Sequence, residues 1–403
     1  MRAHTIDPTL GFLRRYWLAF AIVLAFVAMW GALWAVHPTR VGIKTMLIVP
    51  DLFGSPVSVL KMVGEEPVRE EVWLNVPEGR GMLVADVYRP RDGGVHGGMV
   101  ISVGAAPKIR EHPGVIRLSN TAARAGMVVM IPQLYYPFRE NVLPEDVQGL
   151  VNAFGTNVEE IIASYEWLSE QPYVDPDRLG IFGASAGAGI ALVSASDRRI
   201  NRDVDFFAAL GGYYDLVDLI SAITTESIEY EGETEHWEPW LTSVRVLYNS
   251  VISYLPDPGD RRILTDIFVD EEEGARDQVS RLSPRAREIF EAFDERDPDR
   301  ILEFWGEVSP QDIATLRDVS PSSAVAALDT ELFIMHDRSD PFIPYVESRR
   351  LRDATANNGH RVYFAEFDFL NHVEPRNPSN PFAFMADMVK LTYYSWKLML
   401  RVI

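Results

Sequence analysis

From about residue 70 onward, segments with the apolar pattern of a strand alternate with segments that have the apolar pattern of a helix. This predicts strands alternating with helices. The runs Val72–Val76 and Met82–Tyr88 flank a Pro-Glu-Gly-Arg-Gly turn and predict a hairpin. Short apolar runs, typical of strands buried in a parallel sheet, follow along the chain. They are Met99–Val103, Met127–Ile131, Leu179–Phe182, Phe206–Leu210, Glu331–Met335 and Val362–Phe367.

Helical periodicity fills several of the intervals between these runs. In Asn157–Glu170 the apolar residues share one face, and Glu159, Glu160 and Glu166 are expected to face away from it. Further helices are predicted at Ala186–Val193, Tyr345–Ala356 and Pro381–Leu400. Alternation of this kind predicts an α/β class protein, with a mostly parallel sheet covered on both faces.

One long stretch departs from the alternation. Residues 222–318 are rich in Glu, Asp, Arg and Trp, and they carry helical periodicity without strong strand signals. We interpret them as a helical cap inserted between residues 70–221 and 319–403, which form the two parts of the core. A cap in this position typically covers a site at the carboxyl ends of the strands.

The N-terminal region, residues 1–40, is predicted to anchor the chain in a membrane. Tyr16–Val36 contains 21 residues without a charge, enough to cross a hydrocarbon core of about 30 Å. Basic residues are slightly more frequent before the run, which favours a cytoplasmic N-terminus and a catalytic part on the outer side. A cleaved signal peptide is the alternative, but the run is long and no small-residue cleavage site follows it. Residues 41–69 form a juxtamembrane segment, and its apolar part, residues 41–64, is expected to pack on the domain or to lie on the bilayer; we favour packing.

Composition narrows the chemistry of this 403-residue chain. It contains no cysteine, which excludes disulfides, a cysteine nucleophile and cysteine-ligated zinc. Its net charge of −20 argues against a general affinity for nucleic acid, because binding to phosphates needs clustered Lys and Arg.

The motif Gly183-Ala184-Ser185-Ala186-Gly187 is the strongest chemical signal in the sequence. It follows the apolar run Leu179–Phe182 and opens a helix of small residues. A tight turn from strand to helix presents a serine hydroxyl above the sheet, and small flanking residues let the backbones approach closely. The alternative is a glycine-rich turn that only packs a helix on a sheet. We favour Ser185 as a nucleophile, with the backbone N–H of Ala186 as an oxyanion donor.

A serine hydroxyl needs a base, and the chain has eight histidines from which to choose. His372 follows the last predicted strand and is our candidate, because a histidine downstream of both partners matches one known order of such triads. An ordinary loop histidine is the alternative. The other histidines flank the apolar N-terminal run or lie in loops, in the cap or at a strand end: His4, His37, His96, His112, His236, His336 and His360.

Two carboxylates compete for the role of the acid that orients the base. Both Asp337 and Asp340 lie in the loop that follows the strand Glu331–Met335. We favour Asp340, while Asp337 is the candidate for a turn residue; the chain order of serine, acid and histidine permits either. A second oxyanion donor is expected from the loop after Met99–Val103. Pro107 has no N–H, so the donor there is Ala105 or Ala106.

Together these residues resemble the α/β-hydrolase superfamily, and within it the dienelactone hydrolase and prolyl-oligopeptidase-like esterase branch. The resemblance covers roughly residues 70–400 and is carried by three segments, Val84–Pro90, Val174–Gly183 and Asp340–Pro344. It implies an α/β-hydrolase fold and a triad of Ser185, Asp340 and His372. The family usually has a glycine where this chain has Asp337.

These observations predict hydrolysis of a carboxylic ester, with an amide or thioester as the less favoured alternative, through an acyl-enzyme that needs no metal or organic cofactor. A lipid-like ester is one hypothesis for the substrate. Trp237 and Trp240 in the cap, and Tyr135-Tyr136, could line an acyl pocket, although aromatic residues more often pack in a core. The alternatives are an acyltransferase that uses the same triad and a non-catalytic binding protein of this fold at the membrane.

Overall fold

An eight-stranded sheet forms the centre of the computed structural model, which describes residues 36–52, 58–76, 81–103, 108–134, 147–307, 310–376 and 380–403. The strand order is β1-β2-β4-β3-β5-β6-β9-β10. Strand β2 is antiparallel to β1 and β4, and the other neighbouring pairs are parallel. The strands are β1 Val68–Val76, β2 Gly81–Arg89, β3 His96–Val103, β4 Val128–Pro132, β5 Val174–Ala184, β6 Phe206–Leu210, β9 Glu331–Asp337 and β10 Val362–Phe367.

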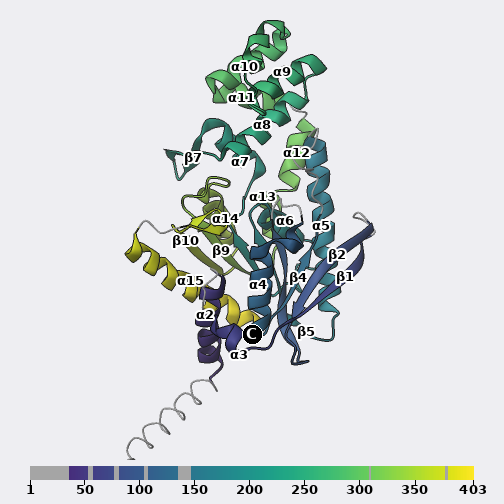
Figure 1. Cartoon of the computed structure of the whole chain (residues 1–403), viewed down its shortest axis with the longest axis vertical. Helices are drawn as coiled ribbons and strands as arrows, with labels where there is room; N and C mark the ends of the chain where they lie inside the picture. The colour runs from purple at the N-terminus through teal and green to yellow at the C-terminus, as the bar shows by residue number, and fades with distance from the viewer. Residues whose placement is uncertain are drawn as a thin grey trace, which may run out of the picture.

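Helices cover both faces of this sheet (Figure 1). Side chains alternate along each strand, so Val100 and Ile181 enter one core and Ile101 and Phe206 enter the other. The first core lies under α5 Val147–Ser169, α6 Ala186–Ala195 and α14 Tyr345–Asn357. The second lies under α2 His37–Leu52, α4 Pro113–Arg124 and α15 Pro381–Val402. A mostly parallel sheet between two helical layers is the predicted architecture and is consistent with the α/β-hydrolase fold.

Most predicted strands and helices are present within a few residues of their expected bounds, but α5 differs from its prediction. It begins at Val147, ten residues before the predicted start, and the prediction that Glu160 faces away from the core is wrong. Glu160 is fully buried. The physical reason is that α5 packs on α6 and on α12 Pro310–Asp318 as well as on the sheet, so more than one of its sides is covered.

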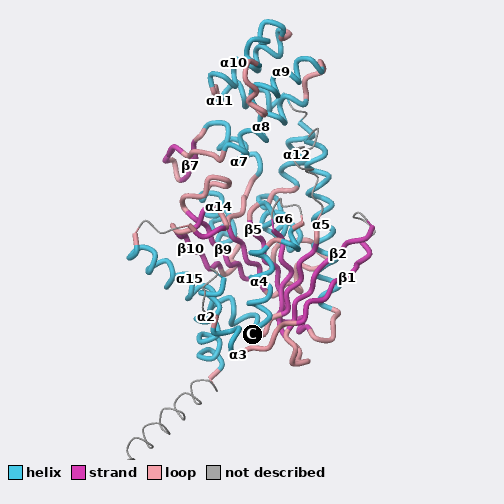
Figure 2. Tube along the Cα trace, viewed as in Figure 1, coloured by secondary structure: helices cyan, strands magenta, loops and turns pink. Residues whose placement is uncertain are grey.

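The chain between β6 and β9 forms a largely helical unit beyond the sheet (Figure 2). It has its own apolar core, in which Leu264, Ala286 and Phe293 are buried. Its helices are α7 Leu216–Thr225, α8 Leu241–Ser253, α9 Pro258–Phe268, α10 Pro284–Glu295, α11 Pro298–Glu307 and α12.

This region also contains a hairpin that the sequence analysis did not predict. Strands β7 Ser227–Tyr230 and β8 Glu233–His236 pair around a turn at Glu231-Gly232. Both turn residues have positive φ, at 55° and 81°. Asn-Gly and Asp-Gly are the usual signals for such a turn, and Glu-Gly is not.

The described residues of this apolar segment, 41–52 and 58–64, form helices that pack on the domain, which was the favoured interpretation. Helix α2 buries Val41, Ile48 and Val49 against α4 and α15. A short helix, α3 Val59–Val63, follows and contacts both α2 and α4. Within the described ranges, no helix has both the length and the apolarity needed to cross a membrane. All of the predicted span Tyr16–Val36 except its last residue lies outside those ranges.

Candidate active site

Ser185 occupies the turn between β5 and α6 in a strained backbone conformation. Its φ of 56° and ψ of −141° are unusual for a residue with a side chain. Two hydrogen bonds hold the turn: Ser185 N–H donates to the Leu210 carbonyl over 2.9 Å, and Ala188 N–H donates to the Ser185 carbonyl over 2.9 Å. A Cβ on Gly183 would lie 2.3 Å from the Ala188 Cα, so only glycine allows this close approach. This is the geometry of a nucleophile elbow.

His372 lies in a second tight turn, within hydrogen-bonding distance of a buried carboxylate. The short strands β11 Leu370–Asn371 and β12 Glu374–Pro375 pair around it, and its φ is 63°. Its Nδ1 lies 2.6 Å from Oδ2 of Asp340. Both side chains are buried, with 8% of His372 and 1% of Asp340 exposed.

The surroundings of Asp340 favour its ionised form. Burial alone would raise its pKa, but hydrogen bonds from His336 and His372 outweigh burial and hold the pKa below its usual value. The other oxygen, Oδ1, accepts hydrogen bonds from Phe342 N–H at 2.8 Å and Ile343 N–H at 3.1 Å. An ionised carboxylate only accepts hydrogen bonds, so Nδ1 of His372 carries the proton and Nε2 is free to accept one.

Asp340 also contacts His336, which is fully buried. Nε2 of His336 lies 3.3 Å from Oδ2 of Asp340 and 2.9 Å from the Ile343 carbonyl oxygen. Nδ1 lies 2.5 Å from Oγ of Ser348. Both oxygens near Nε2 can only accept a hydrogen bond, so Nε2 of His336 carries the proton. His336 thereby holds in place residues 337–344, which we call the acid loop.

Asp337, the competing carboxylate, makes a different set of contacts. Its Oδ2 accepts from Phe369 N–H at 2.9 Å and Leu370 N–H at 2.6 Å, and its Oδ1 accepts from Ser339 N–H at 2.9 Å. Burial raises its pKa, against the lowering effect of these backbone hydrogen bonds. Asp337 therefore ties the acid loop to the segment that leads into His372, while the bond to the imidazole comes from Asp340.

The end of β6 brings the serine and the histidine–aspartate pair together. Leu210 holds the turn of Ser185, and the next residue, Gly211, donates its N–H to the Met335 carbonyl of β9. A Cβ on Gly211, which has a φ of +62°, would lie 3.3 Å from Oδ2 of Asp340 and 3.5 Å from Nδ1 of His372. Parallel strands place their carboxyl ends at one edge of the sheet, and the turns that carry Ser185, Asp340 and His372 follow the carboxyl ends of β5, β9 and β10 at this edge.

Of the three predicted oxyanion donors, the structure describes Ala186 alone. Ala186 is the first residue of α6, so its N–H is one of the unbonded donors at a helix N-terminus. Ala105 and Ala106 lie outside the described residues, as do Tyr135 and Tyr136.

Two cap tryptophans contact the acid loop, and sequence reasoning had placed them only as pocket or core residues. Trp237 is buried and its Nε1–H donates to the Asp340 carbonyl over 2.9 Å. Trp240 is 44% exposed, and its N–H donates to the Pro341 carbonyl over 2.7 Å. Its ring stacks on Phe342 at 5.1 Å, and Phe342 lies 4.8 Å from the His372 ring. An aromatic stack therefore leads from the cap surface to the imidazole.

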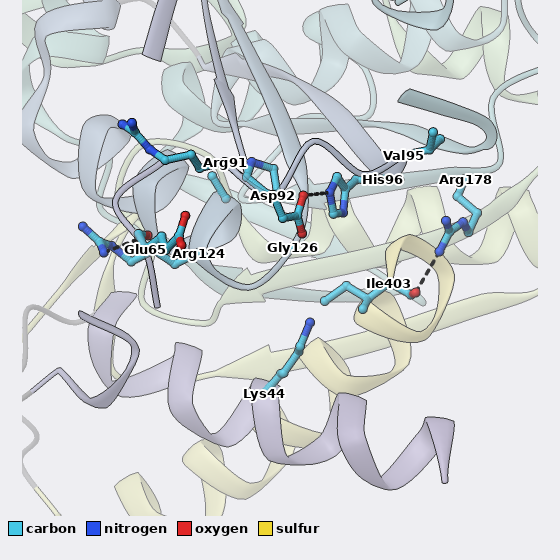
Figure 3. Close-up of a pocket in the computed structure, with 13 residues that line it drawn as sticks. Lys44, Glu65, Arg91, Asp92, Val95, His96, Arg124, Gly126, Arg178 and Ile403 are labelled. Carbon is cyan, nitrogen blue, oxygen red and sulfur yellow. Dashed lines mark hydrogen bonds and ion pairs between the residues drawn. The ribbon is translucent and has the colours of Figure 1, made fainter. Parts of the chain in front are cut away.

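A separate pocket of about 350 Å³ lies at the opposite edge of the sheet (Figure 3). His96 begins β3 there and bonds Asp92 at 2.8 Å, and Arg178 donates to the Ile403 carbonyl oxygen at 2.7 Å. Lys44 of α2 also lines this pocket. Because β3 and β5 are parallel, the amino end of β3 and Ser185 lie at opposite ends of the strands. The pocket is thus distinct from the candidate active site.

Comparison with known proteins agrees with the resemblance inferred from the sequence. Residues 152–257, which include Ser185, match the prolyl oligopeptidase family. This match covers about a quarter of the chain and confirms the predicted similarity to that family. No curated protein matches the chain by sequence.

Several solved structures are similar in fold. Dipeptidyl peptidase 4 of Porphyromonas gingivalis aligns with 82% of this chain and 36% of its own, at 14% identity and a TM-score of 0.46. Acylaminoacyl peptidase of Pyrococcus horikoshii aligns with 78% of this chain and 39% of its own, at 13% identity and a TM-score of 0.44. An esterase of Pyrobaculum calidifontis aligns with 89% of this chain and 91% of its own, at 16% identity and a TM-score of 0.45. The chain thus spans well under half the length of the two peptidases.

Proposed function

We propose that this protein hydrolyses a carboxylic ester through an acyl-enzyme on Ser185, with His372 as base and Asp340 as orienting acid. The observation that carries the proposal is the 2.6 Å contact between Nδ1 of His372 and the ionised Asp340, beside the strained turn of Ser185. A loop histidine without a catalytic role has no need of a buried carboxylate that fixes its tautomer.

The reaction follows from the protonation states. Oγ of Ser185 attacks the ester carbonyl while Nε2 of His372 takes its proton, and the carbonyl oxygen becomes an oxyanion. Ala186 N–H and an N–H of Ala105 or Ala106 stabilise that charge. The intermediate collapses, His372 returns the proton to the departing alcohol, and an acyl-enzyme remains. Water then repeats the sequence with His372 as base and releases the acid.

Cleavage of an amide is the second candidate, and the family match favours it, because the matched family is named for an oligopeptidase. Amide and ester hydrolysis use the same three residues, so the pocket decides between them. A panel of p-nitrophenyl esters and aminoacyl p-nitroanilides separates the two. Addition of an alcohol acceptor, with analysis of the products, tests acyl transfer.

Labelling with a fluorophosphonate probe tests the nucleophile directly. We expect the full-length protein in detergent to label, Ser185→Ala to lose all labelling and His372→Ala to lose most of it. Ser169→Ala is a matched control, because Ser169 bonds only the nearby Glu166 carbonyl at the end of α5 and should label as the parent does. A folded parent that does not label would refute the proposal and favour a binding protein of this fold.

We also propose that Tyr16–Val36 anchors the chain, with residues 70–403 on the outer side of the membrane. The support is the uncharged length of this segment and the basic bias before it. Protease treatment of intact cells is expected to remove the domain and leave a short membrane-bound fragment. Release of the whole protein by a carbonate wash would contradict the anchor.

A further inference from the structure

The outer face of α15 is apolar and lacks a partner among the described residues. Phe382 is 83% exposed, Met385 65%, Val389 70% and Tyr393 55%. Their spacing of three, four and four residues places them on one side of the helix. The opposite side packs on the domain through Phe384, Leu391 and Tyr394. A helix at a domain surface normally turns its polar side outward, so this stripe needs an occupant.

The position of α15 links this stripe to the predicted anchor. Helices α2 and α15 pack together, and Nε1 of Trp396 donates to the Pro38 carbonyl over 2.9 Å. Pro38 follows the uncharged run by two residues, which span at most about 7 Å. Met46 on α2 and Met62 on α3 are also exposed, at 67% and 78%. The helices that follow the run therefore also expose apolar side chains.

The charge of these three helices differs from that of the whole chain. Helices α2, α3 and α15 contain six basic residues and two acidic residues, Asp51 and Asp387, both of which are buried. Lys44 bonds the Ala125 carbonyl, Lys390 pairs with Asp387 and Arg401 pairs with Glu331, so the positive charge of this surface comes from Arg40, Lys61 and Lys397. The whole protein has a net charge of −20. A basic and apolar surface on an acidic protein fits a layer of anionic lipid headgroups over acyl chains. A symmetric dimer through this surface would instead place two basic faces against each other.

We infer that the outer face of α15, with the exposed methionines of α2 and α3, docks on the surface of an anionic lipid bilayer. The stripe from Phe382 to Tyr393 covers twelve residues, which corresponds to a rise of about 17 Å along the helix. The predicted span holds this face near the bilayer, and contact of the stripe with lipid would then orient α15 parallel to the bilayer surface. This inference rests on the sequence of the span and on the surface of α15, and it is independent of the proposed hydrolysis.

Docking would bring the candidate base close to the lipid. The inner side of α15 contacts the segment before His372: Phe384 lies 5.8 Å from Phe369, and Oδ2 of Asp387 accepts from Asp368 N–H at 3.0 Å. Only the thickness of one helix, about 10 Å, separates the stripe from that segment. A lipid-like ester would thus meet the domain on the side that carries His372.

The cysteine-free sequence allows a direct test with a single introduced thiol. The full-length variants Val389→Cys and Arg262→Cys are labelled with the environment-sensitive dye NBD. They are then reconstituted in vesicles of phosphatidylcholine and phosphatidylglycerol, with or without nitroxide-bearing lipid. Arg262 lies on α9 of the cap, and its side chain is 83% exposed, so it reports a position away from α15. We expect a blue-shifted emission for Val389→Cys, and quenching by nitroxide lipid several-fold stronger than for Arg262→Cys.

Two outcomes would overturn the inference. A water-like emission from Val389→Cys, with quenching no stronger than that of Arg262→Cys, would show that the stripe faces solvent. A blue-shifted emission without quenching by nitroxide lipid would show that protein, such as a second copy of the chain, covers it. Fluorophosphonate labelling of both variants reports the active site separately, so failure of the proposed function leaves the docking result readable.

Discussion

Replacement of Asp340 by asparagine should nearly abolish catalysis without changing the shape of the acid loop. Oδ1 accepts hydrogen bonds from Phe342 and Ile343 N–H, so the amide oxygen of the asparagine must occupy that side. Its NH₂ group then faces Nδ1 of His372, 2.6 Å away in the parent. A donor in this position forces Nδ1 to accept, which moves the imidazole proton to Nε2, where it blocks removal of the serine proton.

The size of the effect follows from the role of the tautomer. In a serine protease the same change of the triad aspartate lowers kcat about 10⁴-fold, which corresponds to roughly 5.5 kcal/mol of transition-state stabilisation. We expect a loss of similar order in the rate of fluorophosphonate labelling by Asp340→Asn. Labelling that is quenched after different times, at several probe concentrations, gives the second-order rate constant. Urea unfolding of the same samples shows whether parent and variant are folded.

Asp337→Asn is the matched control, because it removes the other buried carboxylate of the same loop. Asparagine can still accept from Phe369 and Leu370 N–H, but its NH₂ group then faces the N–H of Ser339. We expect a loss of about 1–3 kcal/mol in the free energy of unfolding and a labelling rate within tenfold of the parent. The reasoning fails if Asp340→Asn labels within tenfold of the parent, or if folded Asp337→Asn loses as much activity as Asp340→Asn.

Three further predictions concern the surroundings of the triad. Gly211→Ala should lower the labelling rate by roughly 10–100-fold, because its Cβ would crowd Asp340 and His372. Gly232→Ala is the control, because its new Cβ lies in open space and only the cost of a positive φ, about 1 kcal/mol, applies. It should label normally, so equal labelling rates for the two variants would contradict this account. Trp237→Phe removes the bond to the Asp340 carbonyl and should cost about 1 kcal/mol in urea unfolding, whereas an unchanged midpoint would exclude a stabilising bond. The lowered pKa of Asp340 means that its stabilising effect is present above the ordinary pKa near 3.9 and is lost as the pH falls through its folded-state pKa. Between pH 5 and pH 2 the parent should therefore lose more unfolding free energy than Asp340→Asn, and parallel curves would count against an ionised Asp340.

The sequence predicted those parts of the fold that carry a strong local signal. Strands β6 and β10 have the predicted bounds, because short apolar runs between polar segments define them. The elbow at Ser185 was predicted for the same reason, since a strand, a small-residue turn and a helix are consecutive in the chain.

Features that depend on distant contacts were not predictable in this way. Asp337 and Asp340 are three residues apart, and the bonds that distinguish their roles, to Leu370 N–H and to His372, come from residues more than thirty positions away in the sequence. The bond from Trp237 to the Asp340 carbonyl joins positions 103 residues apart and has no local signature. Glu160 is buried because other helices pack on α5, and one of them, α12, is far from α5 in the sequence.

The cap leaves and rejoins the sheet at nearly the same point. Ser322 N–H donates to the Tyr214 carbonyl over 3.0 Å, and Leu216 N–H donates to Oγ of Ser320 over 3.0 Å. Because its two ends are one hydrogen bond apart, the roughly one hundred residues between them could be shortened, lengthened or exchanged without moving β6 or β9. The proposed catalytic residues and the cap could then evolve separately. A chimaera with another cap grafted at Tyr214 and Ser322 would keep the elbow, but it would lose the bonds from Trp237 and Trp240 to Asp340 and Pro341 unless the new cap replaced them.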